Sequence, residues 1–315
     1  MNEITIETSR RRPRFHRAET TPSFQLTERD VEIIRLVANH RFLRSTHLSQ
    51  LLNASHKKIC ERLTPLYHAG YLDRPRAQLD YHVRGGGSAH LVYALGNRGA
   101  QILTVRDGSA YANVDWTHKN NKSGREFIQH TLAISDVRVA LILGCGAFNS
   151  ATFQHREQLF ETLPTQTQTD RNPWAWRVGV RHGEAFHQLG LIPDYIFALL
   201  LTDGRRRPFV LECDRGTMPV ERTSLNQTSI LRKFLAYETG RLQGLHTNRF
   251  GWKNFRVLTV TGSPERVNNM RSLITRTPIL KNSPLFLFAD HSSLLKSNIL
   301  THPWCDASGK THSLI

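Results

Sequence analysis

Two apolar runs separated by one short polar turn constrain the fold of this chain more than any other feature. Residues 193–200 and 208–214 have the length and composition of strands, and the turn between them contains Asp203 and Gly204. Apolar runs joined by a glycine-containing turn predict a buried antiparallel hairpin. Further strands are predicted over 151–156, 174–180, 255–261 and 285–288, and helices over 123–143, 223–244 and 263–275. The region 123–315 is therefore predicted to be an α/β (α+β) domain with a mixed sheet.

The preceding region, residues 26–105, has the pattern of a small DNA-binding module. Thr27 and Asp30 are spaced as the N-cap and reciprocal partner of a first helix. Shorter helices are predicted after Ser45 and after Ser55. Two strands follow, at 71–72 and 91–95, around the loop Gly85-Gly86-Gly87. Three helices followed by a hairpin predict a winged helix-turn-helix domain.

Basic side chains gather on this module where a recognition helix and a wing would meet DNA. The third helix places Ile59, Leu63 and Leu66 on its apolar face, which leaves its amino-terminal half basic. We predict DNA contacts from the basic residues outside that face and in the wing: His56, Lys57, Lys58, Arg62, Arg74, Arg76 and Arg84. The alternative is that these charges form an ordinary solvated helix face.

Positive charge extends over the whole chain. Its 315 residues include 42 Lys and Arg against 26 Asp and Glu, a net charge of +16, with excesses of +7 over residues 1–120 and +9 over 121–315. Because both halves are basic, a basic tail on a neutral enzyme is excluded, and double-stranded DNA is the predicted partner. Residues 1–25 are predicted to be a flexible basic arm, and 106–122 a linker.

The same composition excludes several classes of protein. The four cysteines, Cys60, Cys145, Cys213 and Cys305, are too far apart for paired zinc ligands and too few for a disulfide scaffold, which favours the cytoplasm. We predict no membrane span and no secretion signal. The chain has no glycine-rich phosphate loop, so ATP is not implied.

Acidic residues lie at one end of both strands of the predicted hairpin. Asp194 begins the first strand, and Glu212 and Asp214 end the second on one face, since side chains alternate along a strand. A two-residue turn would pair Asp194 with Cys213 and turn it away, whereas a three- or five-residue loop or a bulge would pair it with Asp214. Three convergent carboxylates would need a cation, and their hard oxygens favour Mg²⁺ or Mn²⁺.

The alternative for these acids is structural. Asp194 would then cap the strand entry, while Glu212 and Asp214 would pair at the surface with nearby arginines, namely Arg205, Arg215 or Arg222.

These residues carry a resemblance. The order of helix, three strands, helix and strand, with Pro193-Asp194 and Glu212-x-Asp214, resembles the PD-(D/E)XK restriction-endonuclease-like fold, with 174–180 as an insertion. More closely, the chain resembles the bacterial replication-relaxation family over about residues 26–305. The matching motifs are Leu26-Thr27-Glu28-Arg29-Asp30, His130-Thr131-Leu132-Ala133, Pro193-Asp194, Glu212-Cys213-Asp214-Arg215-Gly216-Thr217, and Lys233 with Tyr237. The resemblance implies replication or relaxation of plasmid DNA.

The resemblance to the nuclease fold also implies roles for single residues. Asp194 and Glu212 match its two acidic positions and would hold the metal, but Asp214 stands where that pattern has a lysine. An aspartate cannot supply the positive charge of that lysine. Lys233 on the following helix can supply an amine from another backbone position, with Tyr237 one turn further on the same face. A migrated lysine and an inactive fold both remain open.

Two further residues are predicted to be auxiliary. Glu126 and His130 are four residues apart on a helix, so they share a face and can add a metal ligand or a proton-transfer group. The alternative for each is a polar residue with an ordinary structural partner.

Two functions follow from these patterns. The first is a metal-dependent DNA nickase or endonuclease, and the second is a non-catalytic DNA-binding initiator, accessory or regulatory factor with a degenerate nuclease fold. Replication or transfer proteins and a second copy of the chain are the further partners we predict. A simple transcriptional repressor would leave the second domain without a role.

Overall fold

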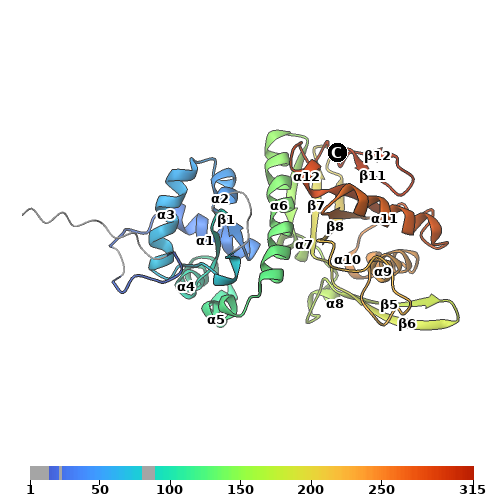
Figure 1. Cartoon of the computed structure of the whole chain (residues 1–315), viewed down its shortest axis with the longest axis horizontal. Helices are drawn as coiled ribbons and strands as arrows, with labels where there is room; N and C mark the ends of the chain where they lie inside the picture. Colours follow the sequence, from blue (N-terminus) through green and yellow to red (C-terminus); the bar gives the residue numbers. More distant parts are fainter. Residues whose placement is uncertain (1–13, 21–22, 80–88) are drawn as a thin grey trace, which may run out of the picture. The chain divides into compact units, whose positions relative to one another are not determined.

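The computed structural model describes residues 14–20, 23–79 and 89–315, and the chain divides into two compact units, 1–135 and 136–315 (Figure 1). Arg84 and the loop Gly85-Gly86-Gly87 lie outside the described residues, as do residues 1–13 of the predicted arm.

The first unit contains short helices and a small sheet. Its main elements are α1 (Glu28–His40), β1 (Leu43–Arg44), α2 (Ser45–Leu51), α3 (His56–His68), β2 (Leu72–Asp73), β3 (Val92–Leu95), α4 (Asn97–Asp107) and α5 (Trp116–Asn121). The three strands are antiparallel in the order β1-β3-β2. The predicted caps are confirmed, since Thr27 and Asp30 form a capping box on α1 and Ser55 caps α3. The apolar face predicted for α3 is buried.

The region predicted as a linker is helical and packs on the first unit. Residues 110–113 form a short 3₁₀ helix, and α5 follows it. Asn120 is buried, and its amide donates to the Asp73 carboxylate at 2.7 Å and to the Leu95 carbonyl at 2.8 Å. These hydrogen bonds attach α5 to β2 and β3.

Part of the predicted arm also contacts the first unit. The Arg17 guanidinium donates to the backbone carbonyls of Tyr67 and Leu72 and pairs with Asp73. The backbone N–H of Ala18 donates to His68 Nδ1 at 3.0 Å. Residues 17 and 18 thus have defined partners on α3 and β2.

The second unit contains the mixed sheet that the sequence predicts. After α6 (Arg125–Ala147), which crosses the boundary between the units, its strands are β4 (Ala151–His155), β5 (Trp176–His182), β6 (Ala185–Leu191), β7 (Tyr195–Leu201), β8 (Arg206–Asp214), β9 (Arg256–Thr261), β10 (Phe286–Asp290), β11 (Trp304–Cys305) and β12 (Thr311–His312). The seven-stranded sheet has the order β12-β11-β10-β9-β8-β7-β4, and β8, β9 and β10 are parallel while the other pairs are antiparallel.

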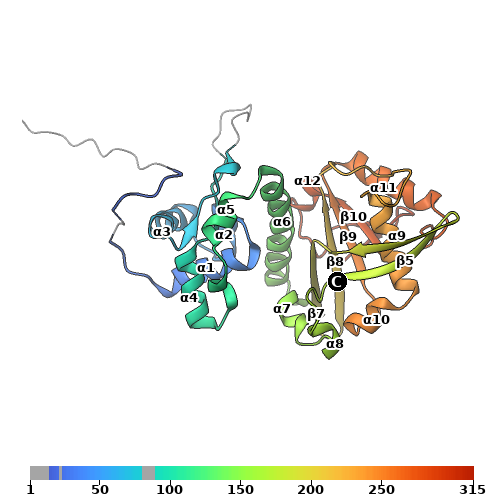
Figure 2. The ribbon, with the colours of Figure 1, turned by 90° about the horizontal axis from the view of Figure 1, so that it is seen from below.

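Helices cover both faces of this sheet, as Figures 1 and 2 show. The helices of the second unit after α6 are α7 (Arg156–Phe160), α8 (Thr165–Gln168), α9 (Ile230–Leu242), α10 (Leu245–Phe250), α11 (Pro264–Arg276) and α12 (His291–Leu294). Side chains of α9 and α11 share the main core with Val210 and Val257 of the sheet. On the other face, the second-unit part of α6 places Arg138 over the ring of Tyr195, 4.0 Å from its centre.

The β5–β6 hairpin forms a separate two-stranded sheet. Only its first strand was predicted, because Phe186 faces outward and His187 inward on the second, which breaks its apolar alternation. The inward side chains of both strands, such as Trp176, Val178 and Leu189, are buried in the main core, and the hairpin contacts α9. The segment 174–180, predicted to be an insertion, therefore belongs to this hairpin.

Helix α9 is shorter than predicted. It begins at Ile230, where Ser229 accepts a hydrogen bond from the N–H of Arg232, and not at residue 223. The polar stretch before Ser229 lacks apolar residues at helical spacing.

Helix α6 is the one helix in the described parts of the chain that is long and apolar enough to cross a membrane. Half of its most apolar window is buried inside the protein.

Candidate functional site

The register of the β7–β8 hairpin decides which acids meet. Tyr195 pairs with Leu211, and the N–H of Leu201 donates to the carbonyl of Arg205 at 2.9 Å. The loop between Leu201 and Arg205 has three residues. Its last residue, Gly204, has a φ of 81°, in the left-handed region that favours glycine. Continued by one residue, this register places Asp194 opposite Glu212. Both registers considered from the sequence are therefore wrong, because the loop begins one residue earlier than a pairing with Asp214 needs.

Asp194 lies at the entry of β7 and is half-buried. Its Oδ2 atom accepts a hydrogen bond from the backbone N–H of Cys213 at 2.8 Å. This bond ties the carboxylate to the neighbouring strand next to Glu212.

Glu212 is a buried acid on the face of β8 that packs against α9. Only 4% of the residue is exposed. Its Oε2 atom accepts from Lys233 Nζ at 2.5 Å, and its Oε1 atom accepts from the Tyr237 hydroxyl. The predicted proximity of Lys233 and Tyr237 on one face of α9 is therefore confirmed, and both side chains contact the same carboxylate.

The charges in this cluster influence one another strongly. Burial and then the charge of Asp194 raise the pKa of Glu212 to about 7, against the opposing effect of Lys233. Burial lowers the pKa of Lys233, but the charges of Glu212 and Asp194 outweigh it, so the net pKa is raised. Burial also raises the pKa of Tyr237 well above its ordinary value. The amine thus keeps its proton near neutral pH, while Glu212 titrates there.

Asp214 does not join this cluster. Its carboxylate accepts from Arg266 Nε at 2.8 Å, from the Thr261 hydroxyl at 3.2 Å and from the backbone N–H of Gly216 at 3.1 Å. The predicted convergence of three carboxylates is wrong, because β9 and α11 provide closer partners for the last of them. Within the described ranges, no three His, Cys, Asp or Glu side chains form a metal-binding group.

The raised pKa of Glu212 predicts how stability changes with pH. The folded protein holds a proton on Glu212 up to a pKa of about 7, whereas the unfolded chain releases it near 4.5. The contribution of Glu212 to the free energy of unfolding is therefore largest below about pH 4.5 and falls as the pH rises to about 7. As the pH rises through this window, we expect the thermal unfolding temperature of the intact protein to fall below that of Glu212→Gln, because glutamine does not titrate. Parallel pH profiles of the two proteins would contradict the assignment.

The predicted DNA-contacting residues fall into two groups. Lys57 and Lys58 are exposed at the start of α3, and Arg76 is exposed after β2. His56 is also exposed, and its Nε2 atom lies 2.8 Å from the Ser45 hydroxyl. These four side chains are accessible to a ligand.

The other two described residues have internal partners. Arg62 binds the fully buried Asp30 through Nε at 2.9 Å and Nη2 at 2.5 Å. Arg74 is buried, with its guanidinium 4.2 Å from the ring centre of Tyr67 and 5.2 Å from that of Tyr93. Sequence spacing cannot show these long-range partners, so two structural arginines appear there as surface charges.

The predicted auxiliary residues belong to the first unit. Glu126 is exposed and His130 is half-buried, one turn apart on α6. Asp194 and Glu212 belong to the second unit. The auxiliary role of Glu126 and His130 stays a prediction.

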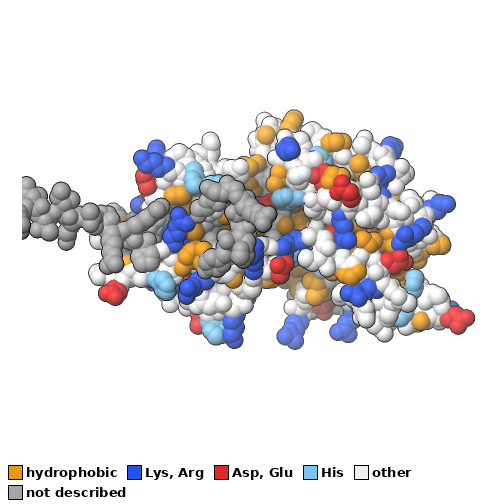
Figure 3. All heavy atoms as spheres, in the orientation of Figure 1, with side chains coloured by type: hydrophobic (Ala, Val, Ile, Leu, Met, Phe, Trp, Pro, Cys, Tyr) orange, Lys and Arg blue, Asp and Glu red, His pale blue; other side chains and the backbone are white. Residues whose placement is uncertain are grey.

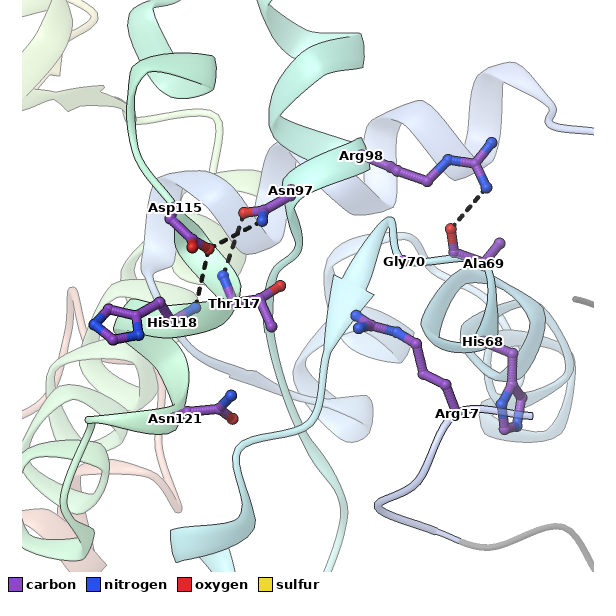
Figure 4. Close-up of a pocket in the computed structure, with 10 residues that line it drawn as sticks. All are labelled: Arg17, His68, Ala69, Gly70, Asn97, Arg98, Asp115, Thr117, His118 and Asn121. Carbon is purple, nitrogen blue, oxygen red and sulfur yellow. Dashed lines mark hydrogen bonds between the residues drawn. The ribbon is translucent and has the colours of Figure 1, made fainter. Parts of the chain in front are cut away.

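A pocket of about 620 Å³ in the first unit was not predicted (Figure 4). Its polar groups serve local structure, since Arg98 donates to the Ala69 carbonyl at 2.9 Å and Asn97 donates to Asp115 at 3.0 Å. Arg17, which also lines it, pairs with Asp73. These polar residues therefore have a structural role in the first unit.

A larger groove of about 1240 Å³ in the second unit was also missed. It lies where β8 and β9 begin, six residues of β8, or about 20 Å, from Glu212. Its described lining contains no Asp or Glu but six cationic side chains: Arg205, Arg206, Arg207, Arg241, Lys253 and Arg256. Figure 3 shows Lys and Arg spread over the visible face of this unit. The run of three arginines after Gly204 was the available signal.

Comparisons with known proteins extend this description. A family model described as replication-relaxation matches residues 34–253, a range that includes α3, Asp194, Glu212 and Lys233. No curated protein and no solved structure matches the chain. Because the family match covers more than half of its length, the chain belongs to the replication-relaxation family, which suggests a role in the replication or relaxation of a plasmid or another mobile element.

Proposed function

We propose that this protein binds double-stranded DNA and nicks it with a divalent metal ion held by Asp194 and Glu212. The observation that carries the proposal is the β7–β8 register, which, continued by one residue, places Asp194 opposite Glu212, with the Lys233 amine 2.5 Å from Glu212. A buried acid with a raised pKa beside a second acid and a cation is typical of functional sites.

The donor set fits Mg²⁺ or Mn²⁺. Mg²⁺ is usually bound by one or two carboxylates, with waters and substrate phosphates completing its coordination. Asp194 and Glu212 would supply the two carboxylates. When bound, the ion would activate water and offset charge on the leaving oxygen.

The remaining residues of the cluster have distinct roles in this proposal. Lys233, whose side chain is 28% exposed, brings a positive charge to the place where a scissile phosphate would lie. It would act as the migrated lysine, since Asp214 is bound to Arg266. Tyr237 is fully buried and donates to Glu212, so it orients that carboxylate and does not attack DNA itself.

The first unit would bind the duplex. The element order of α1, β1, α2, α3, β2 and β3 supports a winged helix, with α3 as its recognition helix. The exposed Lys57 and Lys58 would contact phosphates, and the cationic groove of the second unit would add to the attraction.

We expect the double variant Lys57→Ala, Lys58→Ala to weaken duplex binding similarly for all DNA sequences. Each lost phosphate contact lowers the slope of log affinity against log salt by about 0.9, so the slope should fall by roughly 2. Fluorescence anisotropy over a salt series measures both. The control, Lys119→Ala with Lys122→Ala, changes the same charge elsewhere in the first unit. Equal losses in the two double variants would contradict a specific role for α3.

A second function is favoured by one observation. Both oxygens of Glu212 already accept hydrogen bonds, from Lys233 and Tyr237, which suits a closed structural cluster in a non-catalytic DNA-binding factor. Conversion of supercoiled plasmid distinguishes the two functions. Nicked product that needs Mg²⁺ or Mn²⁺ and disappears with chelator supports the nickase. Retarded plasmid that stays supercoiled with either metal contradicts it and supports the binding factor.

A further inference from the structure

The β5–β6 hairpin has one buried face and one unpartnered face. Trp176, Val178 and Val180 point inward and are nearly fully buried. On the outer face, Arg177 pairs with Gly190, Gly179 with Gln188, and Arg181 with Phe186. The side chains on this face are those of Arg177, Arg181, Phe186 and Gln188, and Gly179 leaves space between the two arginines. Figures 1 and 2 both show the turn of the hairpin extending beyond the main sheet.

Phe186 is an exposed aromatic residue whose ring packs against Gly179. It is 64% exposed, among the most exposed large apolar residues in the described chain. A Cβ atom at Gly179 would collide with its ring, so the ring lies diagonally across the hairpin over that glycine. Glycine at 179 therefore allows an aromatic face to lie open to solvent.

Two arginines flank this ring. Arg177 and Arg181 precede and follow Gly179 by two residues, so both share its face. Both are exposed, and neither is paired with a carboxylate of the described chain. Glu184, in the turn, is the one acid in the hairpin sequence. An aromatic surface between two uncompensated cations complements a base with its adjacent phosphates.

The hairpin also leads directly into the acidic cluster. Strand β6 ends at Leu191, three residues before Asp194. Phe186 is five residues from that end, or about 17 Å along the strand. A strand of DNA held on the outer face would thus lie near the entry of β7.

We propose that the outer face of this hairpin binds unpaired DNA, with one base stacked on Phe186 and neighbouring phosphates on Arg177 and Arg181. The proposal rests on the DNA-binding part of the proposed function and is independent of strand scission. Single-stranded DNA is the occupant because a base must leave its duplex to expose a face to the ring. Stacking of this kind tolerates any base, so little sequence preference is expected.

The test uses a single-stranded oligonucleotide carrying 2-aminopurine, bound to the full chain in the presence of chelator. Phe186→Ala removes the ring, and Gly179→Ala displaces it. We expect both to weaken binding by about tenfold or more and to abolish the quenching of 2-aminopurine that stacking causes. Gly190→Ala is the matched control on the same face, because nothing lies within 4 Å of the added methyl. It should bind like the intact protein.

Further variants separate stacking from folding and from the proposed function. Phe186→Trp keeps an aromatic face and should preserve quenching, while Arg181→Gln should lower the salt dependence. Unchanged affinity and quenching in Phe186→Ala would overturn the proposal. Duplex affinity and plasmid nicking are measured on the same variants. Loss of single-strand quenching by Phe186→Ala supports the platform even when the intact protein nicks no plasmid.

Discussion

The Glu212→Gln variant is expected to lose nicking of supercoiled plasmid by about a hundredfold or more, because a neutral amide oxygen binds a divalent ion far more weakly than a carboxylate does. Glutamine keeps the size of the side chain, and its amide oxygen can still accept from Lys233 or Tyr237. Asp194 remains nearby to balance the charge of Lys233. The variant should therefore fold, and its loss of nicking should come from the missing carboxylate and not from unfolding.

Two measurements and one control variant make this result decisive. Conversion of supercoiled plasmid to open circles gives the rate, and hydrogen exchange in β7 and β8 shows whether the sheet is intact. Glu265→Gln is the matched control, since Glu265 is an exposed acid on α11 outside the cluster. It should nick like the intact protein. Nicking by Glu212→Gln at the normal rate would refute the proposed site.

The Arg62→Ala variant should destabilise the first unit by about 2–3 kcal/mol, since the Arg62 side chain is 34% exposed and solvent screens part of its pairing with Asp30. Asp30 has no exposed surface, and Arg62 neutralises it through two hydrogen bonds. The same carboxylate also accepts from the N–H and hydroxyl of Thr27 at the start of α1. Truncating the arginine leaves an unpaired buried charge at a helix cap, where its desolvation is no longer offset.

The loss should appear as faster hydrogen exchange in α1 and α3. Lys58→Ala, on the same helix but exposed, is the comparison and should change stability by no more than about 0.5 kcal/mol. Adding Asp30→Asn to Arg62→Ala should recover part of the loss, because asparagine is uncharged and can still accept from Thr27. Equal exchange rates in Arg62→Ala and Lys58→Ala would show that the pair contributes little. A large effect means that Arg62 variants do not test DNA binding, whereas Lys57 and Lys58 do.

Local rules predicted much of the fold. The capping box of Thr27 and Asp30 depends on residues close in sequence and appears as predicted, and β8 forms over nearly the predicted range. Lys233 contacts Glu212 because α9 packs on the face of the sheet that carries this acid. The capping box needs no knowledge of distant packing, whereas this contact depends on it.

The predictions that were wrong depended on partners distant in sequence or on the position of a single loop residue. A shift of the loop before Gly204 by one residue changed which acid faces Asp194. Arg62 and Asp30 are 32 residues apart, so no periodicity connects them. The strand 185–191 was missed because Phe186 faces outward and His187 faces inward, which breaks the apolar alternation that marks a half-buried strand.

The contacts of Asp214 also link three parts of the second unit. Arg266, at the start of α11, bonds both Asp214 and the carbonyl of Met218, so one strand-end acid joins a helix and a loop to the sheet. An Asp214→Lys substitution would place a second cation against Arg266 and break this link, whereas the buried apolar side chains of α11, such as Val267 and Met270, would still pack in the main core.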